Sequence, residues 1–278
     1  ALDVNTTAQR NTAVGFGALG SSNGSNNTAL GHAALASNTS GVQNVAIGSQ
    51  TLDSSTTSSS HVAVGYQALS ANTTGDANTA IGFQALLDST TSSNHTAVGS
   101  RALHNNTSGQ QNVGLGVNTL FNNTSGDHNT AVGTSCLDAN TTADHNTGVG
   151  HNALGANTTG ANNTAVGADA LDTATTASGN TAVGKDALTA ITTGSNNVGV
   201  GYEANESCTT GSSNIGIGAS ALLSLSSGNN NIGIGPDGGR GISTGSNNIC
   251  VGLDSGRSNS PSGQITTGSN NVVLGNNN

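Results

Sequence analysis

The chain has 278 residues, of which 7% are charged and 2% aromatic, and its formal net charge is −9. An ordinary soluble domain carries about 25% charged residues, so this composition excludes an average globular enzyme. Only five side chains are basic, which excludes a typical binder of the nucleic-acid backbone. No apolar run approaches the roughly 18 residues of a membrane span, so we expect no membrane insertion in this segment.

An internal repeat runs through the chain. A Gly preceded by Val, Ile or Leu recurs sixteen times, and we define it as position 0. Thirteen of the fifteen spacings are 17 residues, the first is 16 and the last is 23. A disordered tract has no reason to keep such a count, so the period predicts a folded array. The glycines are Gly15, Gly31, Gly48, Gly65, Gly82, Gly99, Gly116, Gly133, Gly150, Gly167, Gly184, Gly201, Gly218, Gly235, Gly252 and Gly275.

The chain begins and ends inside a repeat. Residues 1–11 fit positions +3 to −4, and only three residues follow Gly275. We therefore expect residues 1–278 to form a single β-solenoid array, cut within a repeat at both ends. Solenoids normally carry capping elements, which suggests a piece of a longer protein.

Each repeat contains one predicted strand and one predicted turn. Positions −4 to −1 alternate and are rich in Thr and Val, which favours a short strand. The Asn-Thr-Thr-Gly segment at +7 to +10 favours a turn. Because 17 residues are too few for a helix-turn-helix repeat, we predict a parallel β-solenoid of about sixteen coils, each rising about 4.8 Å.

The charged residues predict the exposed corners. Apart from Asp3 and Arg10, they all occupy positions +1, +2, +5, +6 or +11, and none lies between −4 and 0. We expect the side chains at −1 and −3, together with Leu at +4, to fill the interior. Where that Leu is missing, an apolar residue appears at +7: Cys208, Ile242 and Ile265. This exchange indicates that +7 also points inward.

The other strand face, with Ala or Gly at −2 and Asn at −4, is small and uncharged. We interpret it as an interface with another chain, along which Asn side chains stack. The alternative is that −2 faces a cramped part of its own coil.

The last coil, residues 253–270, contains a six-residue insertion around 258–263. It has no pair of acid, base or nucleophile beyond plain serines. We therefore expect no enzymatic activity and assign no catalytic residue.

The strand motif carries a resemblance to two families. Asn44-Val45-Ala46-Ile47-Gly48 and Asn214-Ile215-Gly216-Ile217-Gly218 resemble the head repeats of trimeric autotransporter adhesins of the YadA-like type. The longer form at 78–86 is similar to repeats of phage tail-fibre proteins. The first resemblance implies a left-handed parallel β-roll of three identical chains that acts in surface attachment. The second implies a virion shaft. The 17-residue period is longer than the one usual in the adhesin family.

Other candidate sites have plain interpretations. The segment 15–20 matches G-x-G-x-x-G but lies within the repeat and precedes no helix, so we expect no dinucleotide or other cofactor. His61 and His95 occupy −4, two coils apart, and His128 and His145 occupy −5 of successive coils. Two histidines stacked about 5 Å apart could share a metal, and three-fold symmetry could build a ring of ligands, but we interpret these residues as polar substitutions in the Asn ladder. Cys136, Cys208 and Cys250 are predicted to be small buried residues without a disulfide within one chain, and a link between chains stays open.

Two surface features remain open. Phe16, Tyr66, Phe83 and Tyr202 occupy +1, where they could contact sugars, although covering the corners is the interpretation we favour. Sequons at +7, such as Asn38 and Asn72, follow from the repeat.

These observations predict a structural fibre or shaft of a surface or virion appendage, acting in adhesion or host attachment. It would be extracellular, on a cell surface or on a virion. The expected partners are copies of the same chain in a homotrimer, and a surface glycan or host receptor whose binding residues are not assigned. The alternatives are an ice-binding β-solenoid, with Thr and Ser ladders at +8 and +9, and a carbohydrate-binding module of the tailspike type.

Overall fold

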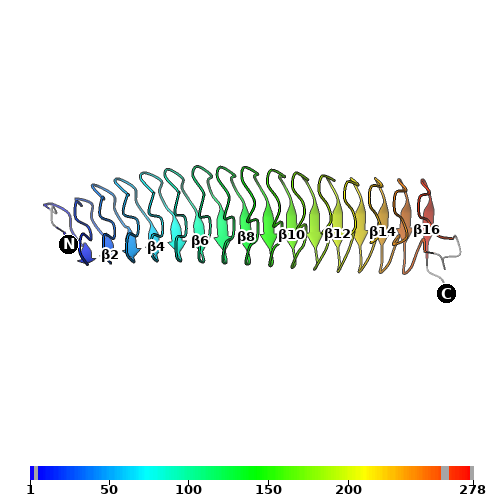
Figure 1. Ribbon diagram of the computed structural model, residues 1–278, viewed down its shortest axis with the longest axis horizontal. Helices are drawn as coiled ribbons and strands as arrows, with labels where there is room; N and C mark the ends of the chain where they lie inside the picture. The colour runs from blue at the N-terminus through cyan, green and yellow to red at the C-terminus, as the bar shows by residue number, and fades with distance from the viewer. Residues whose placement is uncertain (3–5, 258–262, 276–278) are drawn as a thin grey trace. The chain divides into compact units, whose positions relative to one another are not determined.

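A computed structural model describes residues 1–2, 6–257 and 263–275. Asp3 and most of the insertion, at 258–262, lie outside the described residues. Within them are sixteen strands and no helix, so none that could cross a membrane (Figure 1). The predicted all-β solenoid is confirmed, with about fourteen turns at 17-residue spacing. The strands are β1 (Thr12–Val14), β2 (Thr28–Leu30), β3 (Val45–Ile47), β4 (Val62–Val64), β5 (Thr79–Ile81), β6 (Thr96–Val98), β7 (Val113–Leu115), β8 (Thr130–Val132), β9 (Thr147–Val149), β10 (Thr164–Val166), β11 (Thr181–Val183), β12 (Val198–Val200), β13 (Ile215–Ile217), β14 (Ile232–Ile234), β15 (Ile249–Val251) and β16 (Val272–Leu274).

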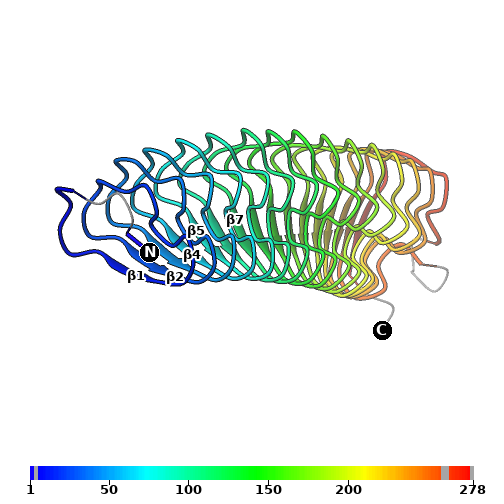
Figure 2. The ribbon, with the colours of Figure 1, turned by 60° about the vertical axis from the view of Figure 1, so that its left-hand side comes forward.

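The chain consists of two compact units, Ala1–Ala143 and Asp144–Asn278. In the first unit β1 to β8 pair in parallel with their neighbours in sequence, and in the second β9 to β16 do the same. Each residue pairs with the residue at the same repeat position, as Ala80 does with Ala97. Figure 2 shows the labelled strands of the first unit following one another in chain order from β1 to β7. The repeat therefore sets the register directly.

The glycine at position 0 allows neighbouring coils to stack. Gly82 has φ +140°, and a Cβ placed on it would lie 2.3 Å from the carbonyl oxygen of Gly99 in the next coil. A contact below 3.0 Å with backbone requires the coil to shift, and this φ is one that L side chains rarely adopt. The close approach of the next coil and the positive φ both require Gly at position 0. This explains why Gly marks the 17-residue period most clearly.

The predicted orientation of the strand faces is wrong. In β5, Ala80 at −2 is fully buried, as is Asn78 at −4 just before the strand, whereas Ile81 at −1 is 36% exposed. Thr79 at −3 also lies on the outer side and is only half-buried. The same pattern holds in most strands, with −2 buried and its two neighbours less so. The small, uncharged flank therefore lines the interior of the coil and is not an interface.

Leucine packing explains this orientation. The −2 residue lies against the Leu at +4 of the preceding coil: a Cβ on Gly114 would be 3.6 Å from Leu103 Cδ1, and one on Gly199 would be 3.1 Å from Leu188 Cγ. A residue larger than Ala cannot share this narrow space with Leu. The alternative, in which −2 faces a cramped part of its own coil, is confirmed.

The asparagines at −4 point inward because the interior contains backbone groups that need hydrogen bonds. The backbone N–H of Asn44 donates to Asn27 Oδ1 (2.9 Å), and Asn27 Nδ2 donates to the carbonyl of Gly41 (2.8 Å). A buried carbonyl without a partner costs about 1–3 kcal/mol. The stacked amides thus replace water inside the coil.

The predicted inward direction of +7 is confirmed, but its chemistry changes along the chain after Asn157. In the first unit Asn123 Nδ2 donates to Asn106 Oδ1 (2.8 Å) and to the carbonyl of Gly126 (3.0 Å). From Ala174 onward the position is apolar, and Cys208 and Ile242 are fully buried where Leu is missing at +4. Ile265 is 6% exposed.

A second exchange, between +4 and −2, is visible only in the structure. Gly239 replaces Leu at +4, and a Cβ on it would lie 3.5 Å from the Cβ of Cys250 at −2. The larger −2 side chain occupies part of the volume that Leu leaves. In the next coil Gly256 at +4 is followed by Val273 at −2, which is 5% exposed.

Candidate functional site

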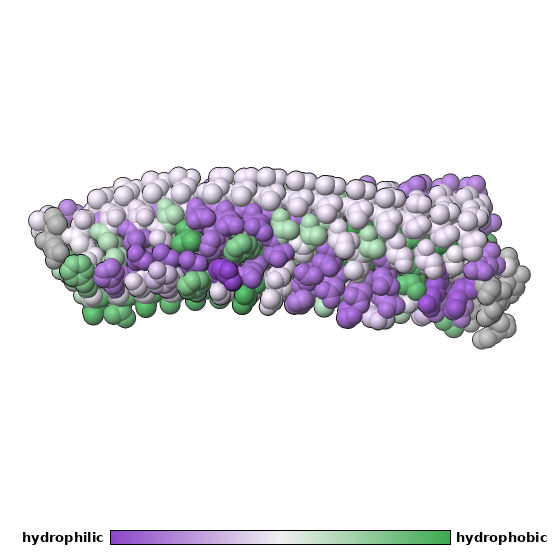
Figure 3. Space-filling model, viewed as in Figure 1, coloured by the Kyte–Doolittle hydropathy of each residue, from purple (hydrophilic) through white to green (hydrophobic). Residues whose placement is uncertain are grey.

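The outward strand face carries a repeated row of apolar side chains in each unit. Its −1 position is Val, Ile or Leu in every repeat, and no Asp, Glu, Lys or Arg lies between −4 and 0. Figure 3 shows apolar side chains along the lower margin of the first unit, the edge toward which its strands point in Figure 1. The members that are more than a third exposed are Val14, Leu30, Ile81, Val149, Val166, Val183, Ile217, Ile234 and Leu274. A regular row of exposed β-branched and leucine side chains suits contact with another flat surface.

The charged residues lie at the corners, as predicted. None of the described Asp, Glu, Lys or Arg residues is buried. Figure 3 shows hydrophilic patches on the face turned toward the viewer, interrupted by apolar side chains. The charged side chains of the surface therefore lie at the corners of the coils.

In the first unit one corner carries stacked rings and amides. The rings of Tyr66 and Phe83 at +1 are parallel within 14°, with centres 5.8 Å apart. Beside them Gln84 Nε2 donates to Gln67 Oε1 (3.0 Å), and Gln67 Nε2 donates to Gln50 Oε1 (3.3 Å). The aromatic residues thus form a stack between coils.

A pocket of about 130 Å³ lies beyond this stack, also within the first unit. It is lined by Arg101, Asn118, Phe121 and Asp138. The Arg101 guanidinium lies 5.8 Å from the centre of the Phe121 ring, and His104 packs on the same ring with a centre distance of 5.0 Å. Sequence reasoning missed this site. The available signal was Phe121 at +5, the one aromatic residue outside position +1.

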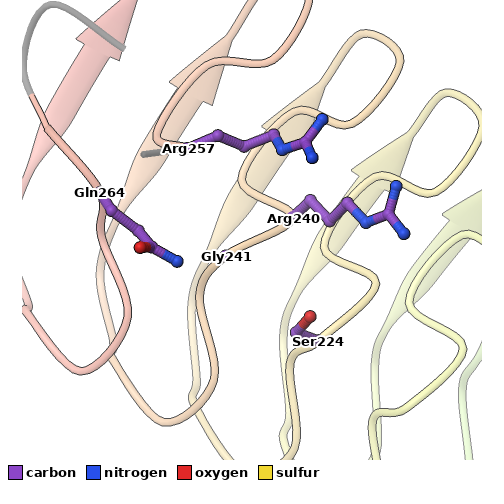
Figure 4. Close-up of a pocket in the computed structure, with 5 residues that line it drawn as sticks. All are labelled: Ser224, Arg240, Gly241, Arg257 and Gln264. Atoms are coloured by element: carbon purple, nitrogen blue, oxygen red, sulfur yellow. The ribbon is translucent and has the colours of Figure 1, made fainter. Parts of the chain in front are cut away.

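In the second unit a corner of the same kind carries paired charges. Arg240 Nη1 donates to Asp237 Oδ1 (2.7 Å), while Arg257 pairs with Asp254 and lies 3.6 Å from Asp237. Figure 4 shows the two arginines side by side and pointing the same way. They line a cavity of about 180 Å³ together with Ser224, Gly241 and Gln264. Because each guanidinium already has a carboxylate partner, this cavity offers no net positive charge for an anion.

The two histidines of interest replace Asn in the interior ladder, as we interpreted them. His95 Nδ1 accepts from the backbone N–H of Asn112 (3.1 Å), and His61 Nδ1 accepts from that of Asn78 (3.1 Å). Burial lowers the pKa of both imidazoles. In the described part of the chain no group of three or more His, Cys, Asp or Glu residues is arranged to hold a metal ion.

The three cysteines are buried free thiols. Burial raises the pKa of Cys136 to about 12 and that of Cys208 and Cys250 to about 11. Thiolate, the nucleophilic form, is therefore scarce at neutral pH. They pack as small side chains.

The remaining motifs are structural. After Gly15 the segment 16–21 forms turns and no helix, which is not the geometry of a dinucleotide site. At +8, the hydroxyl of Thr39 donates to the carbonyl of Thr56 (2.9 Å) and that of Thr107 to Thr124 (3.0 Å). The sequon residues Asn38, Asn72, Asn106, Asn123, Asn140 and Asn157 are fully buried.

Comparison of the chain with protein-family models finds no matching family. Comparison with curated proteins likewise finds no matching relative.

Proposed function

We propose that this chain is the shaft of a surface or virion attachment fibre, in which three copies associate side by side through their outward strand faces. The observation that carries the proposal is the row of Val, Ile and Leu side chains at −1 in each unit, all of them exposed or half-buried, on a face without charge. Soluble single chains rarely expose contiguous apolar surface of this extent. Burying the row against a copy of itself would remove it from water.

The proposal retains an interface between chains but assigns it to the opposite strand face from the one expected from sequence. The −2 and −4 side chains are fully used inside the coil, whereas −1 and −3 are free to meet a partner. Three copies, a left-handed coil and attachment as the role are taken from the resemblance to adhesin head and tail-fibre repeats. Regular coils, turns without long loops among the described residues, and self-satisfied backbone ladders suit a passive spacer outside the cell.

The molecular mass in solution tests the assembly. Analytical ultracentrifugation should give three times the 26.8 kDa of one chain. The double variant Val166→Lys/Ile217→Lys puts two charges on the strand face and should dissociate the trimer, because unpaired buried charge is costly. The matched control, Ala168→Lys/Ala219→Lys, places the same charges two residues later at +1, where Lys185 is found naturally. A monomeric wild-type chain would contradict the proposal.

Ice binding is a second candidate, favoured by the flat outward ladder in which Thr at −3 and Val or Ile at −1 repeat from strand to strand. This alternative was based on hydroxyl ladders at +8 and +9, of which the +8 hydroxyls of Thr39 and Thr107 instead donate to carbonyls of the next coil. Thermal hysteresis in a monomeric wild-type solution would favour ice binding over the fibre.

A further inference from the structure

We propose that the pocket formed by Arg101, Asn118, Phe121 and Asp138 binds a single neutral hexopyranose unit of a glycan. The proposal rests on the attachment role for its biological meaning, but it concerns a corner of the first unit and not the strand face. It assigns the ligand class and the residues that the sequence left open.

The first argument is the arrangement of residues over three successive coils. Arg101 and Asn118 occupy +2, and Phe121 and Asp138 occupy +5. Only here in the chain does an aromatic residue at +5 lie between a basic residue at +2 one coil before it and an acidic residue at +5 one coil after it. Parallel coils about 4.8 Å apart bring these groups around one cavity of about 130 Å³, a size suited to one sugar ring.

The second argument is that the polar groups lining the pocket have capacity for a ligand. Asn118 Oδ1 is buried and has no hydrogen-bond partner. Among the described residues the Arg101 guanidinium forms no ion pair and no side-chain hydrogen bond, and its recorded side-chain contact is the Phe121 ring. An unpaired buried acceptor destabilises the folded chain, and a ligand hydroxyl would satisfy it.

The third argument concerns Asp138. Burial raises the pKa of this carboxyl group, although hydrogen bonds from the backbone at Ala139 and at Asp138 itself oppose the shift. A partly desolvated carboxylate forms a short, charge-assisted hydrogen bond with a hydroxyl donor. Asp138 and Arg101 together make the pocket electrically balanced, so a uronic or sialic acid would meet a carboxylate as well as a cation.

The Phe121 ring supplies the apolar platform. The Arg101 guanidinium lies over this ring, 5.8 Å from its centre, and His104 packs on it at a centre distance of 5.0 Å, yet the ring remains only half-buried. A hexopyranose has an apolar face of C–H bonds and a rim of hydroxyls. We place that face on Phe121 and the hydroxyls toward Asn118 and Asp138. The cavity lined by Arg240 and Arg257 has no aromatic residue in its lining, and both guanidiniums are already paired with carboxylates.

Saturation-transfer difference NMR tests the site, with methyl glycosides of glucose, galactose and mannose as probes and glucuronate as the charged comparison. At least one neutral glycoside should receive saturation, mainly on the ring protons of its apolar face. Phe121→Ala should weaken binding on the order of tenfold, the usual value of an aromatic contact. Arg101→Gln, at an exposed position where Gln occurs in the coils before it, should weaken it without disturbing the fold.

Tyr202→Ala is the matched control, because it removes an exposed aromatic residue of the second unit and should leave binding unchanged. Absence of transfer to every neutral glycoside would overturn the proposal, as would transfer to glucuronate alone. Binding lost in Tyr66→Ala but kept in Phe121→Ala would assign it to the Tyr66–Phe83 stack and overturn it as well. A trimer that binds no sugar would refute only the pocket, whereas a monomer that binds sugar would refute only the fibre.

Discussion

The interiors of the two units differ most at repeat position +7, while their backbones follow the same path. In the first unit +7 is Asn or Ser, and its side chains bond to one another and to the turn, as between Asn106 and Asn123. In the second unit only Asn157 is polar at +7, and the later residues, such as Ile191, Cys208 and Leu225, are apolar and equally buried. The comparison teaches that the coil depends on the parallel ladder and the glycine at 0. The +7 column can be polar or apolar if it is uniform along the stack.

The corners of the two units differ in a parallel way. The first unit presents Gln and aromatic stacks and an arginine without a carboxylate partner, Arg101. The second unit presents arginines that are paired with Asp237 and Asp254. Ligand chemistry is therefore expected on the first unit, where polar groups still have capacity.

The largest effect is expected where the two units agree. Gly99→Ala in the first unit and Gly201→Ala in the second place a Cβ within 2.6 Å of the next coil's backbone and keep a positive φ. Each should cost more than about 4 kcal/mol of unfolding free energy or prevent folding, measured by urea denaturation. Gly275→Ala is the control, since a Cβ there meets no atom within 4 Å. Equal tolerance at all three positions would contradict the stacking argument.

Exchanging the +7 residues tests the difference between the interiors. Asn123→Leu removes the acceptor of Asn140 Nδ2 and the donor to Asn106 Oδ1, and should cost about 2–4 kcal/mol. Leu225→Asn places an amide between Cys208 and Ile242 and should cost a similar amount. Urea denaturation at a fixed protein concentration measures both. If either exchange were neutral, uniformity of the column would not matter.

The pH dependence should be confined to the first unit. Burial lowers the pKa of His61 and His95 in the folded chain. Below about pH 6.5 these two imidazoles are therefore protonated in the unfolded chain but remain neutral in the folded chain. Stability is thus full above that pH and falls as the pH drops, by at most about 1.4 kcal/mol per pH unit for each imidazole, until the folded pKa is reached.

Hydrogen exchange at pH 7.5 and pH 5.5 measures this locally. Amides of β4 to β6 should lose protection at the lower pH, and those of β12 to β14 should not. His61→Asn/His95→Asn restores the ladder residue and should flatten the response, whereas the corner variant His104→Asn should retain it. Equal loss of protection in both units would contradict the assignment.

The smallest effect is expected at Cys208. Ala occurs naturally at the same position as Ala174, so Cys208→Ala should lower the unfolding free energy by about 1 kcal/mol or less. Because burial raises the pKa of this thiol to about 11, alkylation of the wild-type residue at pH 8 should follow the opening of the coil. Rapid labelling of the folded chain would show that the second interior is open to water.

The sequence alone determined the period, the parallel in-register ladder, the charged corners and the inward direction of +7. These features follow from local conformational preferences and from the free-energy cost of burying charge, and the same residue pattern recurs in every repeat. The tertiary structure decided which strand face is inside. Alternation places Ala80 and Ile81 on opposite faces of the strand, but it cannot show which face is inside when neither carries a charge. The narrow space beside Leu at +4 and the buried carbonyls that Asn78 and its equivalents bond to turn the Ala face inward. It also decided the pocket around Phe121, because residues 37 positions apart in sequence become neighbours only when coils stack.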